Sequence, residues 1–190
     1  MKTITIISIL LFWGNSALPQ GLWQEGVIHT KSVDLRCTLS SNKKTYFVKT
    51  STSNSKIELP FGTSEEKGSA KLYINSERIF YYIIADVFSL QRVKEIMEIE
   101  KQIPISFIVD EDGIPIEITF FIKTNTKIKP EELAMIERGL MEKIRFKIIR
   151  EIPFGEPCVY PFLHILKFDE FLKGELKLLK RDEVEGKKYW

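Results

Sequence analysis

The sequence has little of the residue types that build metal centres and nucleophilic active sites. Only two cysteines and two histidines occur among its 190 residues, and their spacing is not that of a compact zinc knuckle. We also find no glycine-rich phosphate loop and no cluster of acid, base and nucleophile. The sequence therefore predicts no catalytic residue, no cofactor and no metal. The four residues with zinc-binding atoms are His29, Cys37, Cys158 and His164.

An excess of one charge sign is missing as well. Lys and Arg number 28 and Asp and Glu number 26, with the two signs interspersed along the chain. Nucleic-acid-binding proteins carry a basic patch or stripe, and surfaces that bind membranes carry basic clusters. The balance predicts neither kind of partner. A hydrophobic content of 44% is that of a globular chain and not of a disordered one.

The apolar run near the start of the chain is too short to span a membrane. It covers residues 4–13, whereas a spanning helix needs about 20 apolar residues. Lys2 precedes it and small polar residues follow it, which is the order of a secretory signal. We therefore expect residues 1–17 to be a signal peptide, no transmembrane anchor after cleavage, and a periplasmic or secreted location. A buried N-terminal strand is the alternative interpretation, because Ile and Thr dominate the first positions.

The two cysteines leave two interpretations open. In an oxidising compartment Cys37 and Cys158 could form one disulfide. It would close a long loop and contribute up to about 4–5 kcal/mol in the chain-entropy model. Two separately buried thiols are the alternative, and in neither case do we expect a catalytic cysteine.

The chain divides into three regions behind the signal. Residues 18–75 are predicted to be β-rich, because residues 33–38 alternate between apolar and polar and further apolar patches follow at 46–48 and 57–59. Residues 76–152 are predicted to form an α+β unit. Residues 153–190 are predicted to be a C-terminal extension that is turn-rich at first and then forms an amphipathic helix.

Two helices are expected in the α+β unit. Ser89 is a good N-cap for the first, because its hydroxyl can accept a bond from an unpaired backbone N–H. Pro130 is suited to the first position of the second helix, followed by two acids that the helix dipole favours. The apolar run at residues 79–85 fits a buried strand or a helix, and its periodicity does not distinguish them.

Residues 105–120 are predicted to form a β-hairpin. Both strands alternate, and an Asp-Gly turn at residues 110–113 joins them. We expect one face of the hairpin to pack against the helix that begins at Pro130. The predicted core residues are Ile105, Phe107, Ile116, Ile118, Phe120, Leu133, Ile136 and Leu140.

A further strand at residues 145–152 is expected to return beside the hairpin. The result would be a small antiparallel sheet with helices packed on one face, which is an α+β fold. Edge strands offer unpaired N–H and C=O groups that can accept an added strand. We therefore predict a partner-binding edge at Phe146, Ile148 and Arg150, of which Phe146 and Ile148 face inward.

Other polar and aromatic groups have a structural interpretation that we favour. The acids at 110–112 lack the alternate spacing of a calcium loop and fit a solvated hairpin tip. Cys158 and His164 could be a thiolate–imidazole pair but lack an orienting third group. The acids at 95–100 fit a solvated helix face and not a glycosidase pair. The aromatic run at 80–82 fits core packing better than a sugar or lipid site.

Residues 89–149 thus have the order helix, strand, Asp-Gly turn, strand, helix, strand. In this order, and in residues 105–113, 116–120 and 128–133, the chain resembles the C-terminal periplasmic domain of TonB-type energy transducers. More broadly, it resembles short exported proteins of unknown function from Bacteroidetes that carry such a unit. The resemblance implies a domain that engages extended peptides of outer-membrane proteins, and it supplies no catalytic residues.

Two classes of function follow from these observations. We favour a non-catalytic exported protein that binds another cell-envelope component, either a protein or a peptide. A secreted enzyme, a hydrolase of unrecognised family, is the alternative. A deep cleft with convergent polar groups would favour the enzyme, whereas an exposed strand edge or a flat apolar patch would favour the binding protein.

Overall fold

The computed structural model describes residues 22–50, 70–76, 78–150, 158–170 and 172–173. The expected signal peptide, the apolar patch at 57–59 and most of the expected C-terminal helix lie outside these residues. The elements in chain order are β1 (Gly26–His29), β2 (Asp34–Leu39), β3 (Thr45–Thr50), β4 (Ala70–Ile74), α1 (Arg78–Val87), α2 (Leu90–Met97), β5 (Gln102–Val109), β6 (Pro115–Lys123), α3 (Pro130–Lys143), β7 (Phe146–Arg150) and β8 (Tyr160–Lys167).

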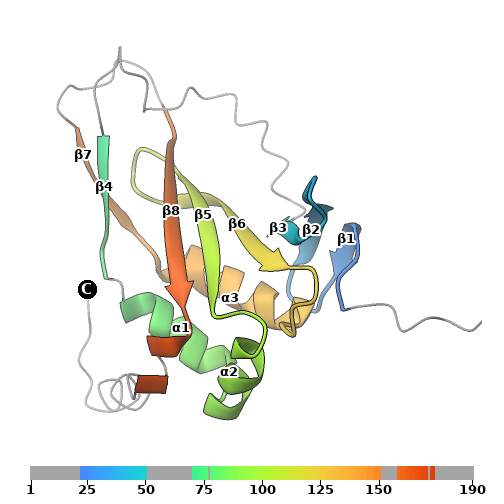
Figure 1. Cartoon of the computed structure of the whole chain (residues 1–190). Coiled ribbons are helices and arrows are strands. Elements are labelled where there is room, and N and C mark those ends of the chain that lie inside the picture. The colour runs from blue at the N-terminus through green and yellow to red at the C-terminus, as the bar shows by residue number, and fades with distance from the viewer. Residues whose placement is uncertain (1–21, 51–69, 77, 151–157, 171, 174–190) are drawn as a thin grey trace, which may run out of the picture.

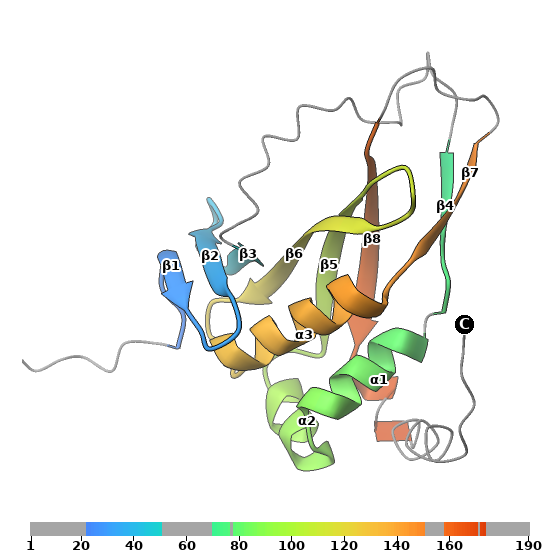
Figure 2. The same ribbon diagram turned by 180° about the vertical axis from the view of Figure 1, so that it is seen from behind.

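The strands form two antiparallel sheets. The larger has six strands in the order β1-β2-β3-β6-β5-β8, and the smaller is a two-stranded ribbon of β4 and β7. Helices α1, α2 and α3 lie on one side of the large sheet (Figures 1 and 2). The structure therefore confirms the α+β class and the packing of helices on one face.

Local sequence signals account for the helices. Ser89 caps α2 by accepting a bond from the backbone N–H of Arg92 at 3.2 Å, as predicted. Pro130 opens α3, and the Glu132 carboxylate accepts from the backbone N–H of Lys129 at 2.7 Å. The ambiguous apolar run forms α1, in which Ile79, Phe80, Ile83 and Ile84 are buried. Its apolar residues fall three and four apart, which suits a helix lying on a sheet.

The predicted hairpin is formed by β5 and β6, and Asp110 builds its turn. One carboxylate oxygen of Asp110 accepts from the backbone N–H groups of Asp112 (3.0 Å) and Ile114 (2.8 Å). Gly113 supplies the positive φ of 78° that the turn requires. These contacts give the acidic tip a structural role.

All but one of the predicted core residues are buried with the hairpin face. The exception is Ile116, which is 36% exposed. The register of β5 and β6 shifts here, from Ile108 opposite Glu117 to Val109 opposite Pro115, so Ile116 is the extra residue of a bulge. A bulge breaks the two-residue period, and the core prediction at Ile116 is wrong for that reason.

The prediction that the strand at 145–152 returns beside the hairpin is also wrong. β7 does not return beside β5 or β6 but pairs with β4, while β5 has β8 as its second partner. β8 was not predicted, since we expected turns and a helix after residue 153. One sheet therefore joins strands from all three regions that the sequence suggested, because β3 pairs with β6 and β8 pairs with β5.

Candidate binding surface

The second face of the six-stranded sheet bears no helix among the described residues (Figure 1). One row of cross-strand neighbours on this face is apolar. Phe47 of β3 lies opposite Phe121 of β6, and Pro104 of β5 lies opposite Ile165 of β8. Phe121 and Pro104 line a common hollow, which connects the two pairs. We call Phe47, Phe121, Pro104 and Ile165 the apolar row.

The apolar row continues to the edge of the sheet. Ile165 is 42% exposed, and its neighbour on the same face of β8, Leu163, is 61% exposed. The rings of Phe47 and Phe121 meet edge to face, with centroids 5.2 Å apart. Grouped apolar side chains that stay in water are a feature of interaction sites, whereas single ones are normal on any surface.

Two open hollows lie along the row and share the rings of Phe47 and Phe121. The larger has a volume of about 450 Å³ and the smaller about 350 Å³. Lys49 and Thr119 contribute to the smaller one. The residues that line the larger are Ser40, Asn42, Thr45, Phe47, Glu100, Gln102, Pro104, Phe121, Ile122 and Lys123. This mixture of apolar and polar residues suits the side chains of a bound partner.

Glu100 lies at one wall of the larger hollow and is buried, in contrast to the predicted solvated face. Its carboxylate accepts from the backbone N–H of Lys123 at 2.7 Å and from the hydroxyl of Thr126. Burial raises the pKa of Glu100, and the bonds from Thr126 and Lys123 oppose that rise. The carboxylate thus fastens the loop between α2 and β5 to the end of β6, and its role is structural.

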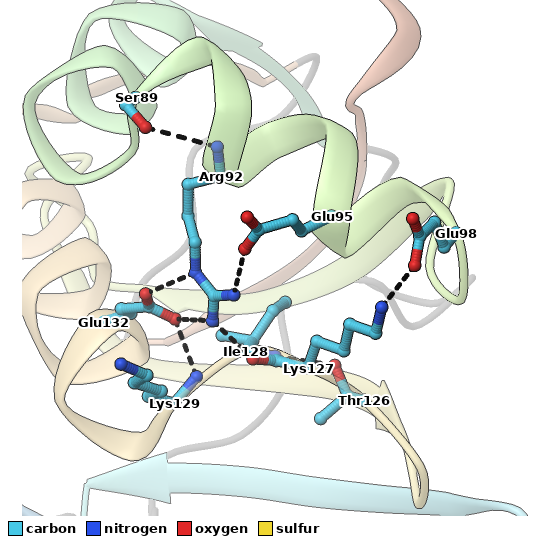
Figure 3. A network of polar contacts seen from close by, with 9 residues as sticks. All are labelled: Ser89, Arg92, Glu95, Glu98, Thr126, Lys127, Ile128, Lys129 and Glu132. Carbon is cyan, nitrogen blue, oxygen red and sulfur yellow. Dashed lines mark hydrogen bonds and ion pairs between the residues drawn. The ribbon is translucent and has the colours of Figure 1, made fainter.

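Arg92 joins α2 to α3 through a network of polar contacts (Figure 3). Its guanidinium donates to both carboxylate oxygens of Glu132, at 2.8 and 2.9 Å. It also donates to Glu95 at 3.0 Å and to the Lys127 carbonyl at 2.5 Å. The bond with Glu132 is the main cause that raises the pKa of Arg92. These charge-assisted bonds hold α2 and α3 together. They also give Glu95 and Glu132 a structural role.

Cys37 and Cys158 are both buried, and no disulfide joins them. Cys37 lies in β2 and Cys158 just before β8, four strand spacings apart in the sheet. At about 4.8 Å per spacing, roughly 19 Å separates these strands, whereas a disulfide needs Cα atoms within about 7 Å. Burial raises the pKa of the Cys37 thiol to about 12, with Glu25 adding to the rise.

Cys158 and His164 have different neighbours. The Cys158 thiol donates to the Tyr160 hydroxyl at 2.9 Å and lies 3.7 Å from Glu111. The His164 ring stacks on Phe80, with centroids 3.9 Å apart. The structure thus packs these two residues separately. Among the described residues, no group of three or more His, Cys, Asp or Glu side chains could hold a metal ion.

The side chains at the predicted partner-binding edge face the interior of the protein. Phe146 is buried and packs against Phe107 and Phe162, with centroids 5.4 and 5.0 Å away. Ile148 is half-buried against the core, and the Arg150 guanidinium lies over the Tyr160 ring at 5.1 Å. Binding of a partner at Phe146, Ile148 and Arg150 stays a prediction.

We expect Glu137→Gln to reduce the pH dependence of stability. Glu137 of α3 is buried and accepts a bond from the Thr50 hydroxyl of β3. Burial raises its pKa above the ordinary 4.5, with the bond from Thr50 opposing the rise. The folded protein therefore holds this proton more tightly than the unfolded chain, and stability is lost as the pH rises through the raised pKa.

The variant has no proton to lose at this position, so its stability should fall less as the pH rises above 4.5. Denaturant titrations at stepped pH measure this. Glu131→Gln, on the exposed side of α3, is the control for the change in net charge. Parallel pH profiles for wild type and Glu137→Gln would contradict the prediction.

These features define an α+β protein. Helices cover one face of its large sheet, and the apolar row lies on the other face. Within the described ranges, none of the helices has the length and the apolar composition of a membrane span. No family model matches the chain, and no curated protein matches it. Among solved structures, it is similar to a DUF5043 family protein from Bacteroides uniformis ATCC 8492.

The two chains share 16% sequence identity and superpose with a TM-score of 0.57. The similarity covers 76% of this chain and 91% of the other. At this identity the comparison shows the fold alone, because one fold can host unrelated functions.

Proposed function

We propose that this protein is a non-catalytic, exported protein that binds another protein of the cell envelope. The binding surface is the apolar row together with the edge strand β8. The observation that carries the proposal is the exposure of Leu163 and Ile165 on an edge strand, 61% and 42%. Exposed apolar side chains on a strand edge favour a partner that covers them.

An added β-strand is the mode of binding that we propose. β8 pairs regularly with β5 over eight residues and has no second strand partner among the described residues. Natural edges are protected by charge, proline or bulges, and here Pro161 and Lys167 lie near the two ends of β8. The central residues 162–166 carry no acid and no lysine or arginine, so an extended peptide meets little repulsion there.

β8 is a better candidate than β7 for this role. The backbone N–H of Phe146 already donates to the Gly113 carbonyl at 2.8 Å, so the start of β7 is engaged on the side of the hairpin. The resemblance to TonB-type C-terminal domains supports the same kind of partner, an extended peptide. Strand addition gives affinity through the main chain and selectivity through side-chain pockets.

The double variant Leu163→Lys/Ile165→Lys should lose its partner and keep its fold. Both side chains are exposed, so lysine costs little stability, while two charges on the open face of β8 oppose its burial by a partner. Affinity purification from the native host, compared by quantitative mass spectrometry, measures the loss. Met135→Lys, at an exposed apolar position on α3, is the matched control. Equal recovery of the same proteins with both variants would contradict the proposed surface.

Export is the second part of the proposal and has its own test. The order of a positive start, an apolar run and small polar residues supports cleavage after Ser16 or Ala17. We expect the mature protein to begin between Ala17 and Leu22. Mass spectrometry of protein recovered from its host decides this, and an intact Met1 or Lys2 on the mature protein would refute it.

A further inference from the structure

The ribbon of β4 and β7 has two chemically different faces. It lies beside the large sheet, next to β8 (Figures 1 and 2). Its inner face, with Leu72, Ile74, Phe146 and Ile148, packs against the core. Its outer residues are exposed and alternate with the inner ones, as expected for strands. The outer residues are Lys71, Tyr73, Asn75, Arg145, Lys147 and Ile149.

Strand pairing brings two lysines together on this outer face. Tyr73 lies opposite Lys147 and Lys71 opposite Ile149, so the two lysines are diagonal neighbours, roughly 7–8 Å apart. Arg145 lies two residues before Lys147, but its guanidinium donates to the carbonyls of Met141 and Ile144, at 3.2 and 2.6 Å, and is engaged at the end of α3. Among the described residues, neither lysine forms an ion pair with an acid. Like charges so placed repel one another, and an anionic partner would relieve that repulsion.

Apolar and aromatic side chains lie between these cations. Tyr73 is 51% exposed and Ile149 is 45% exposed. Each lies directly opposite a lysine, so the face alternates cation with apolar group in both directions. Tyrosine is enriched where membranes meet water, because its ring is apolar and its hydroxyl is polar. Lysines beside it can reach anionic headgroups while their methylene stems cover apolar surface.

We propose that the outer face of the β4–β7 ribbon docks onto an anionic lipid surface. Lys71 and Lys147 contact the headgroups, and Tyr73 and Ile149 enter the interface between them. A lipid surface fits better than an acidic protein, because a narrow two-stranded face offers no pocket for specific side chains, whereas a membrane needs none. The site is distinct from the apolar row, so the protein could hold its partner while resting on the membrane.

Sedimentation with lipid vesicles tests this inference on the full chain. One set of vesicles contains phosphatidylcholine with one third phosphatidylglycerol, and the other contains phosphatidylcholine alone. Residues 4–13 are apolar and could bind lipid by themselves, so the readout is the part of binding that high salt removes. We expect this part only with the anionic vesicles.

Lys71→Gln/Lys147→Gln should lower the salt-sensitive partition about 30-fold, since each basic residue near an anionic membrane contributes about fivefold. Tyr73→Ser/Ile149→Ser should weaken binding while the salt dependence persists. The matched control is Lys94→Gln/Lys101→Gln, an equal change of charge at exposed positions in and just after α2. Unchanged partition in the ribbon variant, or an equal loss in the control, would overturn the proposal. Retention on heparin without vesicle binding would overturn it too, and would indicate a soluble polyanion.

Discussion

Phe107→Ala is expected to lower the free energy of unfolding by about 3–5 kcal/mol, the usual cost of removing a buried phenylalanine. Phe107 is fully buried in β5. Its ring packs against Phe80 of α1 and Phe146 of β7, with centroids 6.0 and 5.4 Å away. It also approaches Phe162 of β8 at 6.4 Å. The ring therefore joins the large sheet, the ribbon and a helix, and little around it can collapse into the cavity.

Chemical denaturation measures this cost, and the hairpin supplies a matched control. Ile116→Ala, at the bulge, removes a side chain that is partly in water and should cost less than about 1 kcal/mol. A loss below about 1 kcal/mol for Phe107→Ala would show that the buried face of the hairpin is misassigned.

Gly113→Ala is expected to cost about 2–4 kcal/mol, which is large for the addition of one methyl group. Its φ of 78° costs an alanine about 1–2 kcal/mol. A Cβ at this position would lie 1.9 Å from the Phe146 carbonyl oxygen, so the hairpin turn and the start of β7 must move apart. That movement breaks the bond from Phe146 N–H to the Gly113 carbonyl, worth about 1 kcal/mol.

Gly26→Ala separates the two causes. Gly26 also has a positive φ, 118°, but a Cβ there would meet nothing within 4 Å. We expect this control to show the backbone penalty alone and to cost less than Gly113→Ala when both are measured by denaturation. A smaller loss for Gly113→Ala than for Gly26→Ala would mean that the turn does not rest on β7.

The parts of the fold that depend on neighbouring residues could be predicted from the sequence. Ser89 caps α2, the Asp-Gly turn joins β5 to β6, and Pro130 opens α3, each for a reason that acts within a few residues. The core face of the hairpin follows from the two-residue period until the bulge at Ile116. A bulge depends on two strands at once, and no local pattern indicates it.

The order of the strands could not be predicted, because it depends on pairing between distant segments. β8 begins with Tyr160-Pro161, which resembles a turn, yet β5 takes this strand as its partner. β4 is a five-residue strand whose partner, β7, lies more than 70 positions further along the chain. With β7 placed beside β4, the edge of the large sheet moves to β8, and the proposed binding surface moves with it.

The candidate surface was missed for a related reason. Phe47 was included in the apolar patch at 46–48, Phe121 lies just beyond the predicted hairpin, and their neighbours Val48 and Phe120 are the buried residues. Where neighbouring residues of a strand are all apolar, the local sequence pattern does not show which of them face the solvent. Only the pairing of β3 with β6 and of β5 with β8 brings the apolar row together. The cations of the ribbon were missed for the same reason: they are far apart in the sequence, and only the pairing of β4 with β7 brings them together.

Photo-crosslinking in the native host tests the central claim most directly. A photoreactive residue replaces Leu163 on β8, and the same residue at Met135 on α3 is the control, since both side chains are exposed. We predict that position 163 captures one defined envelope protein and that an extended segment of that protein carries the crosslink. The control position should not capture it. Capture of the same proteins from both positions, or no capture from position 163 in folded and exported protein, would contradict the account.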